Sequence, residues 1–345
     1  MMEKRYIITG AAGHLGSTLL RLLQNSDAEV YGLLLPGEKP AADVKNVRYV
    51  YGDVCQPESL HPLFRGAEDK EKIVIHTAAI ISIAQGISPQ MYNVNVNGTK
   101  NMIQISREHC VSRFVYVSSV HAIPELPREQ TIREVHAFSP DAVVGGYAKT
   151  KAEAAQAVLD AAAGGFPAVI VHPSGIIGPY DQGRNHLIQM VTSYMGGKLP
   201  ACVKGGYDFV DVRDVAAGCL LAAEKGKVGE CYILNGAYCS IHDLIKKVGE
   251  CCHKKALPAL PVSLARLVAP VIEFIAKQRG KRPLYTRYSL HTVTSNSNFS
   301  HEKAQRELGY RPRAMEETIR DMTDWLLNSR EKSAFFKGEQ RVILC

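Results

Sequence analysis

A tyrosine and a lysine lie four residues apart in the segment Tyr147-Ala-Lys-Thr-Lys151. On a helix, residues at this spacing share one face. A phenol with a pKa of about 10 is a poor acid–base group at neutral pH, and a positive charge one turn away favours its ionisation. The pair could therefore move a proton to or from a substrate oxygen, with Tyr147 as the acid–base group and Lys151 as its electrostatic partner.

Three glycines at intervals of three residues lie near the start of the chain, in Thr9-Gly-Ala-Ala-Gly-His-Leu-Gly16. They follow the apolar run Tyr6–Ile8 and precede a helical pattern from Leu15 to Leu23. Between a strand and a helix, such glycines let the backbone turn tightly and approach a dinucleotide pyrophosphate, whose charge the N–H groups at the helix start receive. The residues expected at the pyrophosphate are Gly10, Gly13, His14, Leu15 and Gly16.

These two motifs, with the serine pair Ser118-Ser119 after the apolar run Arg113–Val117, occur in the order typical of the extended short-chain dehydrogenase/reductase family, also called the NAD-dependent epimerase/dehydratase family. The chain resembles this family from about Tyr6 to Trp325. In form it is most similar to members of the dihydroflavonol 4-reductase and 3β-hydroxysteroid dehydrogenase kind. The resemblance implies an NAD(P)-dependent oxidoreductase with Ser119, Tyr147 and Lys151 as catalytic residues, of which Tyr147 and Lys151 also contact the cofactor.

The two serines compete for one role, because strand alternation sends them to opposite faces. Comparison with the family's strand end favours Ser119 over Ser118 as the residue that hydrogen-bonds the substrate oxygen. His121, two residues later, could line the substrate pocket, although a solvated loop histidine is the commoner case.

The resemblance assigns further cofactor contacts to residues that follow other strands. Asp53 resembles an aspartate that hydrogen-bonds the adenine, and it could instead form a turn. Small residues after the fourth strand would allow close approach of the cofactor. Asn95 matches a family asparagine that stabilises the active-site geometry. The remaining expected cofactor residues are Asp53, Val54, Thr77, Ala78, Ala79 and Pro173.

The segment Leu34-Leu35-Pro36-Gly37-Glu38-Lys39 leaves the choice between NAD and NADP open. An acidic residue at the end of the second strand would hold the ribose 2′-OH, and a basic residue would attract a 2′-phosphate. Glu38 could serve NAD, whereas Lys39 could serve NADP. We expect a slight preference for NADP.

Apolar residues near the expected site suggest a fairly apolar small-molecule substrate, with Ile81 and Ile176 as candidate contacts alongside His121. The neighbouring Ile80, Ile83 and Ile177 are equally compatible with core packing. Arg213 could meet an anionic group or form a surface pair with Asp214. The favoured reaction interconverts a ketone and a secondary alcohol. The alternatives are a nucleotide-sugar epimerase or dehydratase that retains its cofactor, and a non-catalytic NAD(P)-sensing regulator.

The elements that must position these residues alternate between strands and helices, which predicts an α/β fold of the Rossmann type: a doubly wound parallel sheet with a smaller C-terminal substrate-binding lobe. We expect residues 1–174 to form mainly the cofactor domain, 175–330 mainly the lobe, and 331–345 a tail. Further strands are expected at Val30–Leu35, Val47–Tyr51, Ile73–His76, Phe114–Val117 and Ala168–His172. Helical stretches are expected at Glu58–Phe64, Met91–His109, Tyr147–Ala163 and Pro261–Gln278.

The composition of the 345 residues agrees with this expectation. The net charge of +7 is spread along the chain without a basic block, so a nucleic-acid partner is not indicated. Nine cysteines form no CxxC pair, which predicts neither a metal site nor a disulfide framework and favours a cytoplasmic location. From the sequence we expect neither a signal peptide nor a membrane-spanning segment. A homodimer is compatible with the family resemblance.

Overall fold

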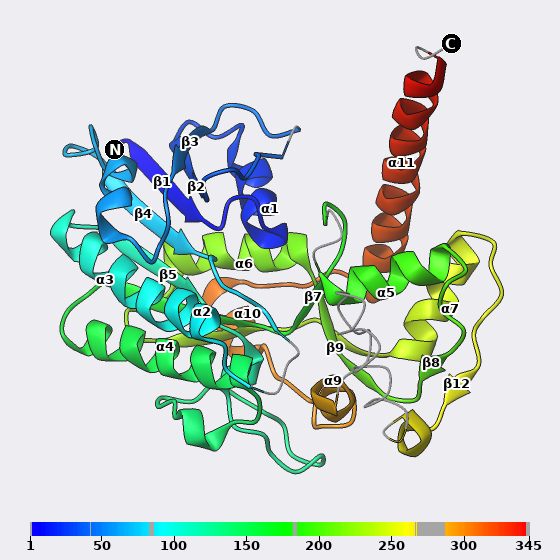
Figure 1. Cartoon of the computed structure of the whole chain (residues 1–345). Coiled ribbons are helices and arrows are strands. Elements are labelled where there is room, and N and C mark those ends of the chain that lie inside the picture. The colour runs from blue at the N-terminus through cyan, green and yellow to red at the C-terminus, as the bar shows by residue number, and fades with distance from the viewer. Residues whose placement is uncertain are drawn as a thin grey trace.

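A seven-stranded sheet forms the centre of the computed structural model, which describes residues 2–41, 43–82, 86–181, 185–265, 267 and 287–342. The strand order is β10-β6-β5-β4-β1-β2-β3, and every neighbouring pair is parallel (Figure 1). The strands are β1 (Lys4–Thr9), β2 (Glu29–Leu34), β3 (Arg48–Tyr51), β4 (Glu71–His76), β5 (Arg113–Val117), β6 (Ala168–Pro173) and β10 (Cys231–Leu234).

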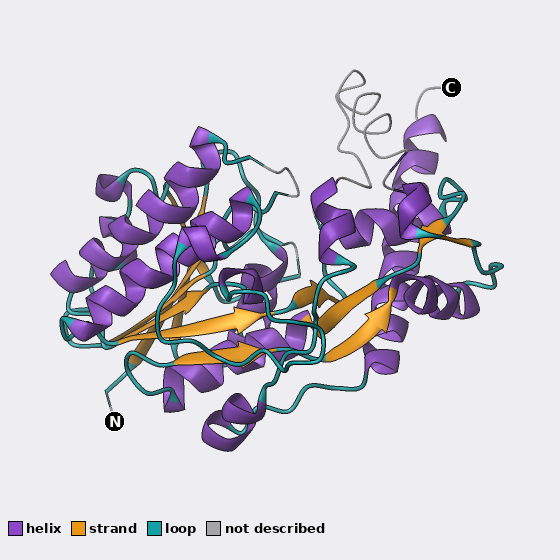
Figure 2. Ribbon diagram, turned by 90° about the horizontal axis from the view of Figure 1, so that it is seen from below, coloured by secondary structure: helices purple, strands orange, loops and turns teal. Residues whose placement is uncertain are grey.

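Helices cover both faces of this sheet, as Figure 2 shows. Successive residues of one strand enter different cores: in β5, Phe114 and Tyr116 join one cluster, and Val115 and Val117 join the other. The first cluster includes α3 (Gly98–Glu108) and α4 (Gly146–Ala163), and the second includes α1 (His14–Leu23) and α6 (Val212–Lys225). Strands buried on both faces explain the continuous apolar runs in the sequence.

The strand order reverses direction beside β1, because the chain passes from β1 to β2 on one side and returns to β4 on the other. In doubly wound sheets, ligands bind at this switch point, outside the carboxyl ends of the strands. The glycine segment, the residues after β4 and the serines after β5 all leave the sheet at this edge. The predicted doubly wound parallel fold is confirmed.

A second, smaller group of elements follows β6. It contains a three-stranded sheet of β7 (Gly175–Ile177), β9 (Gly206–Asp211) and β11 (Ala237–Ser240), and a two-stranded sheet of β8 (Cys202–Val203) and β12 (Ala259–Leu260). The remaining helices in and after this group are α5 (His186–Met195), α7 (Ile241–Cys251), α9 (Arg287–Thr292), α10 (Glu302–Leu308) and α11 (Met315–Val342). Figure 1 shows the end of α11 projecting from the body of the molecule.

Several local expectations need correction. Glu58–Phe64 forms two short 3₁₀ turns, η1 (Pro57–Ser59) and η2 (His61–Leu63), each with a proline in its first turn. The expected helix Met91–His109 is divided into α2 (Pro89–Tyr92), the π turn η3 (Asn93–Asn97) and α3.

At the carboxyl end, the expected boundary at residue 330 lies inside the continuous helix α11. Of the expected helix Pro261–Gln278, residues 266 and 268–278 lie outside the described residues, as does Ile83. Among the described helices, none is long and apolar enough to cross a membrane.

Candidate active site

The glycine segment makes a tight turn between β1 and α1. Gly10 has a φ of +66°, a conformation that favours glycine. A Cβ on Gly16 would lie 2.2 Å from the carbonyl oxygen of Gly10, so only glycine lets α1 start this close to β1. Gly13, the N-cap of α1, provides no side-chain cap, and the first turn of the helix contains no acidic residue. The N–H groups at this helix start are therefore suited to a pyrophosphate, and the segment fits a dinucleotide.

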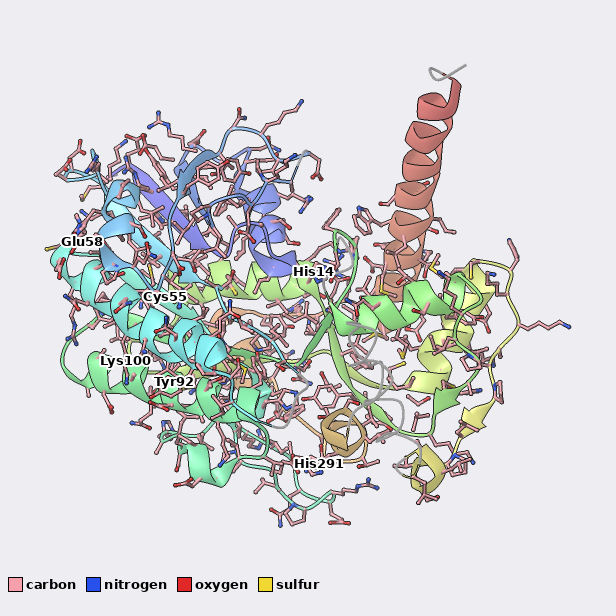
Figure 3. All side chains as sticks on the ribbon, in the orientation of Figure 1. His14, Cys55, Glu58, Tyr92, Lys100 and His291 are labelled. Atoms are coloured by element: carbon pink, nitrogen blue, oxygen red, sulfur yellow. The ribbon has the colours of Figure 1, made fainter. Side chains whose placement is uncertain are left out.

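The imidazole of His14 contacts the segment that follows β7. Its Nε2 lies 2.7 Å from the carbonyl oxygen of Pro179, and its Nδ1 lies 3.7 Å from a carboxylate oxygen of Asp181. Figure 3 labels His14 at the start of α1. Burial lowers the pKa of His14, which favours the neutral ring. Only the backbone of His14 is thus oriented by α1 toward a phosphate, while its ring joins α1 to the segment after β7.

The residues after β4 pack directly on the glycine segment. The backbone N–H groups of Thr77 and Ala78 each donate to Oγ1 of Thr9 at 3.1 Å, and the hydroxyl of Thr77 donates to the carbonyl of Thr9. A Cβ on Gly10 would meet Thr77 and Ala78 at 2.9–3.0 Å. The structure therefore brings Thr77, Ala78 and the adjacent half-buried Ala79 to the same edge as the glycines.

Asp53 and Glu38 both fold back on their own loops. Oδ1 of Asp53 accepts the N–H of Cys55 at 2.8 Å, so this carboxylate forms a turn, and Val54 is buried. Oε2 of Glu38 accepts the N–H of Leu35 at 3.1 Å, which places a carboxylate at the end of β2. Lys39 is exposed.

Asn95 fixes the π turn between α2 and α3. Its amide accepts from the N–H of Ile80 at 2.8 Å and donates to the carbonyl of Ile80 at 3.0 Å. It also donates to the hydroxyl of Thr150 on α4 at 3.0 Å. Asn95 thus joins the loop after β4 to the helix that carries Tyr147 and Lys151, as a positioning residue.

Tyr147 and Lys151 are buried on α4, which begins after Gly145 at a φ of +99°. Nζ of Lys151 donates to the carbonyl of Val117 at 2.6 Å and to Oη of Tyr116 at 3.3 Å. Burial lowers the pKa of Lys151 to about 7. A lysine whose pKa lies near neutral pH is suited to proton transfer next to a phenol.

Ser119, after β5, caps the short turn η4 (Val120–Ala122) and accepts the N–H of His121 on its Oγ at 3.2 Å. This bond leaves the hydroxyl hydrogen of Ser119 available to a substrate oxygen. Nδ1 of the buried His172 lies 3.0 Å from the carbonyl of Ser119. Pro173 follows at the buried end of β6. The hydroxyl of Ser118 is also buried, with no hydrogen-bond partner in the described part of the chain.

The ring of His121 lies beside Tyr147, with ring centroids 6.3 Å apart. It stacks on Tyr207 of β9 with centroids 5.5 Å apart, and its Nε2 lies 3.2 Å from Oη of Tyr207. Burial lowers the pKa of His121 to about 4, with the charge of His291 on α9 acting in the same direction, so the ring is neutral at pH 7. Figure 3 labels His291. His121 is thus a sequence-predicted substrate residue whose ring contacts Tyr147 of α4.

The other substrate candidates lie in different surroundings. Ile81 is 73% exposed, whereas Ile177 is buried in the core. Ile176 packs against the cluster that includes α1 and α6. Arg213 donates to Asp211 and to Asp321 of α11, both at 2.7 Å, so its guanidinium is held within the fold.

Sequence reasoning did not single out Tyr116, Tyr207 or His172. The sequence pattern could have indicated Tyr116 in part, because alternation along β5 places this residue on the face that α4 covers. Tyr207 and His172 come from strands that sequence patterns alone do not place beside η4. Among the described residues, no three His, Cys, Asp or Glu side chains come together as a metal ion would require.

Residues 6–235 match the NAD dependent epimerase/dehydratase family. The chain belongs to this family. It is 30% identical over 323 residues to sterol demethylase protein B of Methylococcus capsulatus, a match that covers 92% of this chain and 97% of that protein. It is 27% identical over 350 residues to a 3-beta-hydroxysteroid dehydrogenase of Mycolicibacterium neoaurum, covering 93% and 92%.

Among solved structures, that of gox2253 superposes with a TM-score of 0.79 and 32% identity, covering 95% of this chain and 99% of that one. The predicted family membership is confirmed, and with it the prediction of an enzyme. This member of the NAD-dependent epimerase/dehydratase family is an NAD-dependent oxidoreductase, and its glycine segment fits the cofactor that the family uses.

Proposed function

We propose that this enzyme interconverts a ketone and a secondary alcohol on a fairly apolar small molecule. The observation that carries the proposal is the neutral, aromatic wall of His121 and Tyr207 beside the catalytic candidate Tyr147. A wall of stacked rings favours a substrate with an apolar or planar body over a diphosphate. The engagement of Arg213 by two carboxylates supports the same substrate class.

In the proposed reaction, Tyr147 gives a proton to the carbonyl oxygen or takes it from the alcohol. Ser119, held by the N–H of His121, donates a hydrogen bond to the same oxygen. In its charged form, Lys151 would favour the ionised phenol of Tyr147, and it would hold the nicotinamide ribose. The bound nicotinamide supplies or receives the hydride at the substrate carbon.

We propose NAD as the preferred form of the cofactor. The slight sequence preference for NADP depended on Lys39, which is exposed, whereas Glu38 presents its carboxylate at the end of β2. A carboxylate there would accept a hydrogen bond from the adenosine ribose and repel a 2′-phosphate. This geometry supports NAD over NADP.

The runner-up is an epimerase or dehydratase that returns the hydride to its own substrate. The two functions differ in net cofactor consumption. A non-catalytic sensor is less well supported, because the buried Tyr147 and Lys151 are both present.

The test is turnover of NADH and NADPH with a panel of carbonyl compounds that includes keto steroids, flavonoid-like ketones and simple aldehydes, followed at the nicotinamide absorbance. We expect substrate-dependent consumption by the wild-type enzyme. In Tyr147→Phe, turnover should fall at least a thousand-fold while cofactor binding changes less than about threefold. Unchanged turnover in this variant would exclude the role of Tyr147. Tight cofactor binding without net consumption would favour the epimerase.

A further inference from the structure

Five buried polar side chains form a continuous series beneath the proposed site. They come from five different elements or their ends, and each residue is at most 3% exposed. We call this series the buried polar chain; its members are Thr9, His76, Thr99, Tyr116 and Lys151. A polar series this deep in a parallel sheet is costly unless every donor and acceptor is satisfied.

Hydrogen bonds and a ring contact connect the members of the buried polar chain. Oγ1 of Thr9 lies 2.7 Å from Nδ1 of His76, and Nε2 of His76 lies 3.2 Å from Oγ1 of Thr99. The ring of His76 stacks on that of Tyr116 with centroids 5.9 Å apart, and Oη of Tyr116 lies 3.3 Å from Nζ of Lys151. Thr9 is the residue before the first glycine of the cofactor segment, so the buried polar chain connects that segment to Lys151.

The direction of the first bonds follows from donor and acceptor counts. Oγ1 of Thr9 already accepts two backbone N–H groups, those of Thr77 and Ala78, so its hydroxyl hydrogen points to Nδ1 of His76. His76 therefore carries its proton on Nε2. Burial lowers the pKa of His76 to about 3, which keeps the ring neutral and this tautomer in place.

The remaining bonds are set in the same way. Thr99 donates its hydroxyl hydrogen to the carbonyl of Asn95 at 2.7 Å, so it accepts from Nε2–H of His76. Burial raises the pKa of Tyr116, which keeps its phenol protonated. An ammonium can only donate, so Oη of Tyr116 is the acceptor in its contact with Lys151.

Lys151 has few other partners. In the described part of the chain it forms no ion pair with a carboxylate, and its two acceptors are the carbonyl of Val117 and Oη of Tyr116. The titratable groups that face it are Tyr116 from β5, Tyr147 from its own helix, His76 from β4 and His172 from β6. As long as Tyr147 is protonated, none of these four groups carries a negative charge at neutral pH.

We propose that Tyr116 is a positioning residue for Lys151: its ring packs on His76, which Thr9 and Thr99 hold in place, and its hydroxyl accepts from the ammonium. Because no carboxylate of the described residues pairs with Lys151, this oxygen stabilises the charged form that Tyr147 requires. The inference rests on the proposed role of Lys151, but its main test does not require turnover.

The first experiment is an NMR titration of the full chain labelled with ¹³C at the lysine Cε positions, in wild type and Tyr116→Phe. The Lys151 resonance is the one missing from Lys151→Met. Phenylalanine keeps the ring and removes only the hydroxyl, so the ammonium loses one of its two acceptors. We expect the Lys151 titration midpoint to fall by about one pH unit, the equivalent of one hydrogen bond to a charged group.

Tyr232→Phe is the matched control. Tyr232 is likewise fully buried, its hydroxyl is hydrogen-bonded to Glu307, and Nζ of Lys303 lies 5.0 Å from its ring centroid. It should lose a similar amount of stability without moving the Lys151 midpoint. If Tyr116→Phe leaves the midpoint unchanged, or if both variants move it equally, the proposal is wrong.

Thr99→Val provides a second variant if Tyr116→Phe does not fold. It is nearly isosteric and removes the acceptor that holds the His76 ring on which Tyr116 packs, so the Lys151 midpoint should move in the same direction by a smaller amount. Thr99→Ser keeps the hydroxyl and should leave the midpoint at its wild-type value. With any substrate found for the enzyme, the pH profile of kcat should shift in parallel in Tyr116→Phe, whereas the Kd for the cofactor should change less than threefold. Wild-type turnover tests the proposed function separately.

Discussion

Lys151 is a buried amine with which no carboxylate of the described residues pairs, and its burial affects the stability of the whole fold. The pKa of Lys151 is lowered from 10.5 to about 7. Between these two values the unfolded chain binds a proton that the folded chain does not. This group therefore makes the protein more stable as pH rises from 7 to 10.5, by about 1.4 kcal/mol per pH unit, and the gain is lost as pH falls back from 10.5 to 7.

The prediction is that wild type gains stability relative to Lys151→Met as pH increases between 7 and 10. Urea unfolding of both proteins at each pH gives the difference, in which the contributions of all other groups cancel. A difference that is flat across this range would show that Lys151 keeps its ordinary pKa in the folded protein.

Glu38 gives a second prediction at the scale of one side chain. NADH should bind at least tenfold more tightly than NADPH, and Glu38→Gln should reduce that ratio by removing the charge that repels the 2′-phosphate. Fluorescence titration of both cofactors provides the measurement. Lys39→Gln is the matched control and should leave the ratio unchanged. Tighter binding of NADPH by the wild type would contradict the proposed preference.

At the scale of elements, the packing of α1 on β1 separates two roles of glycine. A methyl group on Gly16 would overlap the carbonyl of Gly10 at 2.2 Å, whereas one on Gly13 would meet the same oxygen at 3.1 Å. Gly16→Ala should therefore lose about 1–3 kcal/mol of stability, because the helix must move away from the strand. Gly13→Ala should remain close to wild type in stability.

The difference between these two variants should be smaller in cofactor binding than in stability. Gly13→Ala places its methyl group at the helix start, where the pyrophosphate approaches, and should weaken NADH binding at least tenfold. Chemical denaturation and NADH titration together measure both effects. Equal losses of stability in the two variants would mean that α1 adapts to either methyl group.

Sequence reasoning succeeded for these elements because each has a local cause. Apolar runs buried on both faces identified the strands, and the glycine spacing identified the turn before α1. It was less informative where distant strands meet. The contact between His121 on η4 and Tyr207 on β9 depends on how the smaller sheet packs on the larger one, and no local pattern encodes that packing. Prolines in η1 and η2 also overrode an apolar pattern that indicated a regular helix.

At the scale of the whole molecule, ion pairs connect β9 and α6 to α11. Asp211 is fully buried in its side chain and pairs with Arg213, which also reaches Asp321. Arg313 pairs with Asp214 at 2.9 Å. These pairs attach the last helix to the body of the molecule.

Arg213→Met should therefore destabilise the protein by about 3 kcal/mol, because it leaves the buried Asp211 carboxylate with only the more distant Arg313, 3.7 Å away, as a charge partner. The KM for a ketone substrate should change less than threefold, since the guanidinium belongs to the fold. Thermal unfolding and steady-state kinetics of the same preparation test both statements. A large rise in KM with unchanged stability would instead place Arg213 at the substrate.

The position of β10 determines how the protein must be assembled during synthesis. β10 pairs with β6 at the edge of the main sheet, yet the chain passes through β7, α5, β9 and α6 before it reaches residues 231–234. While the ribosome is producing those elements, β6 is an open edge with unpaired backbone groups that could pair with another nascent chain. A chain stopped near residue 200 should therefore aggregate, and release of a competent sheet must wait until Leu234 has left the ribosomal exit tunnel.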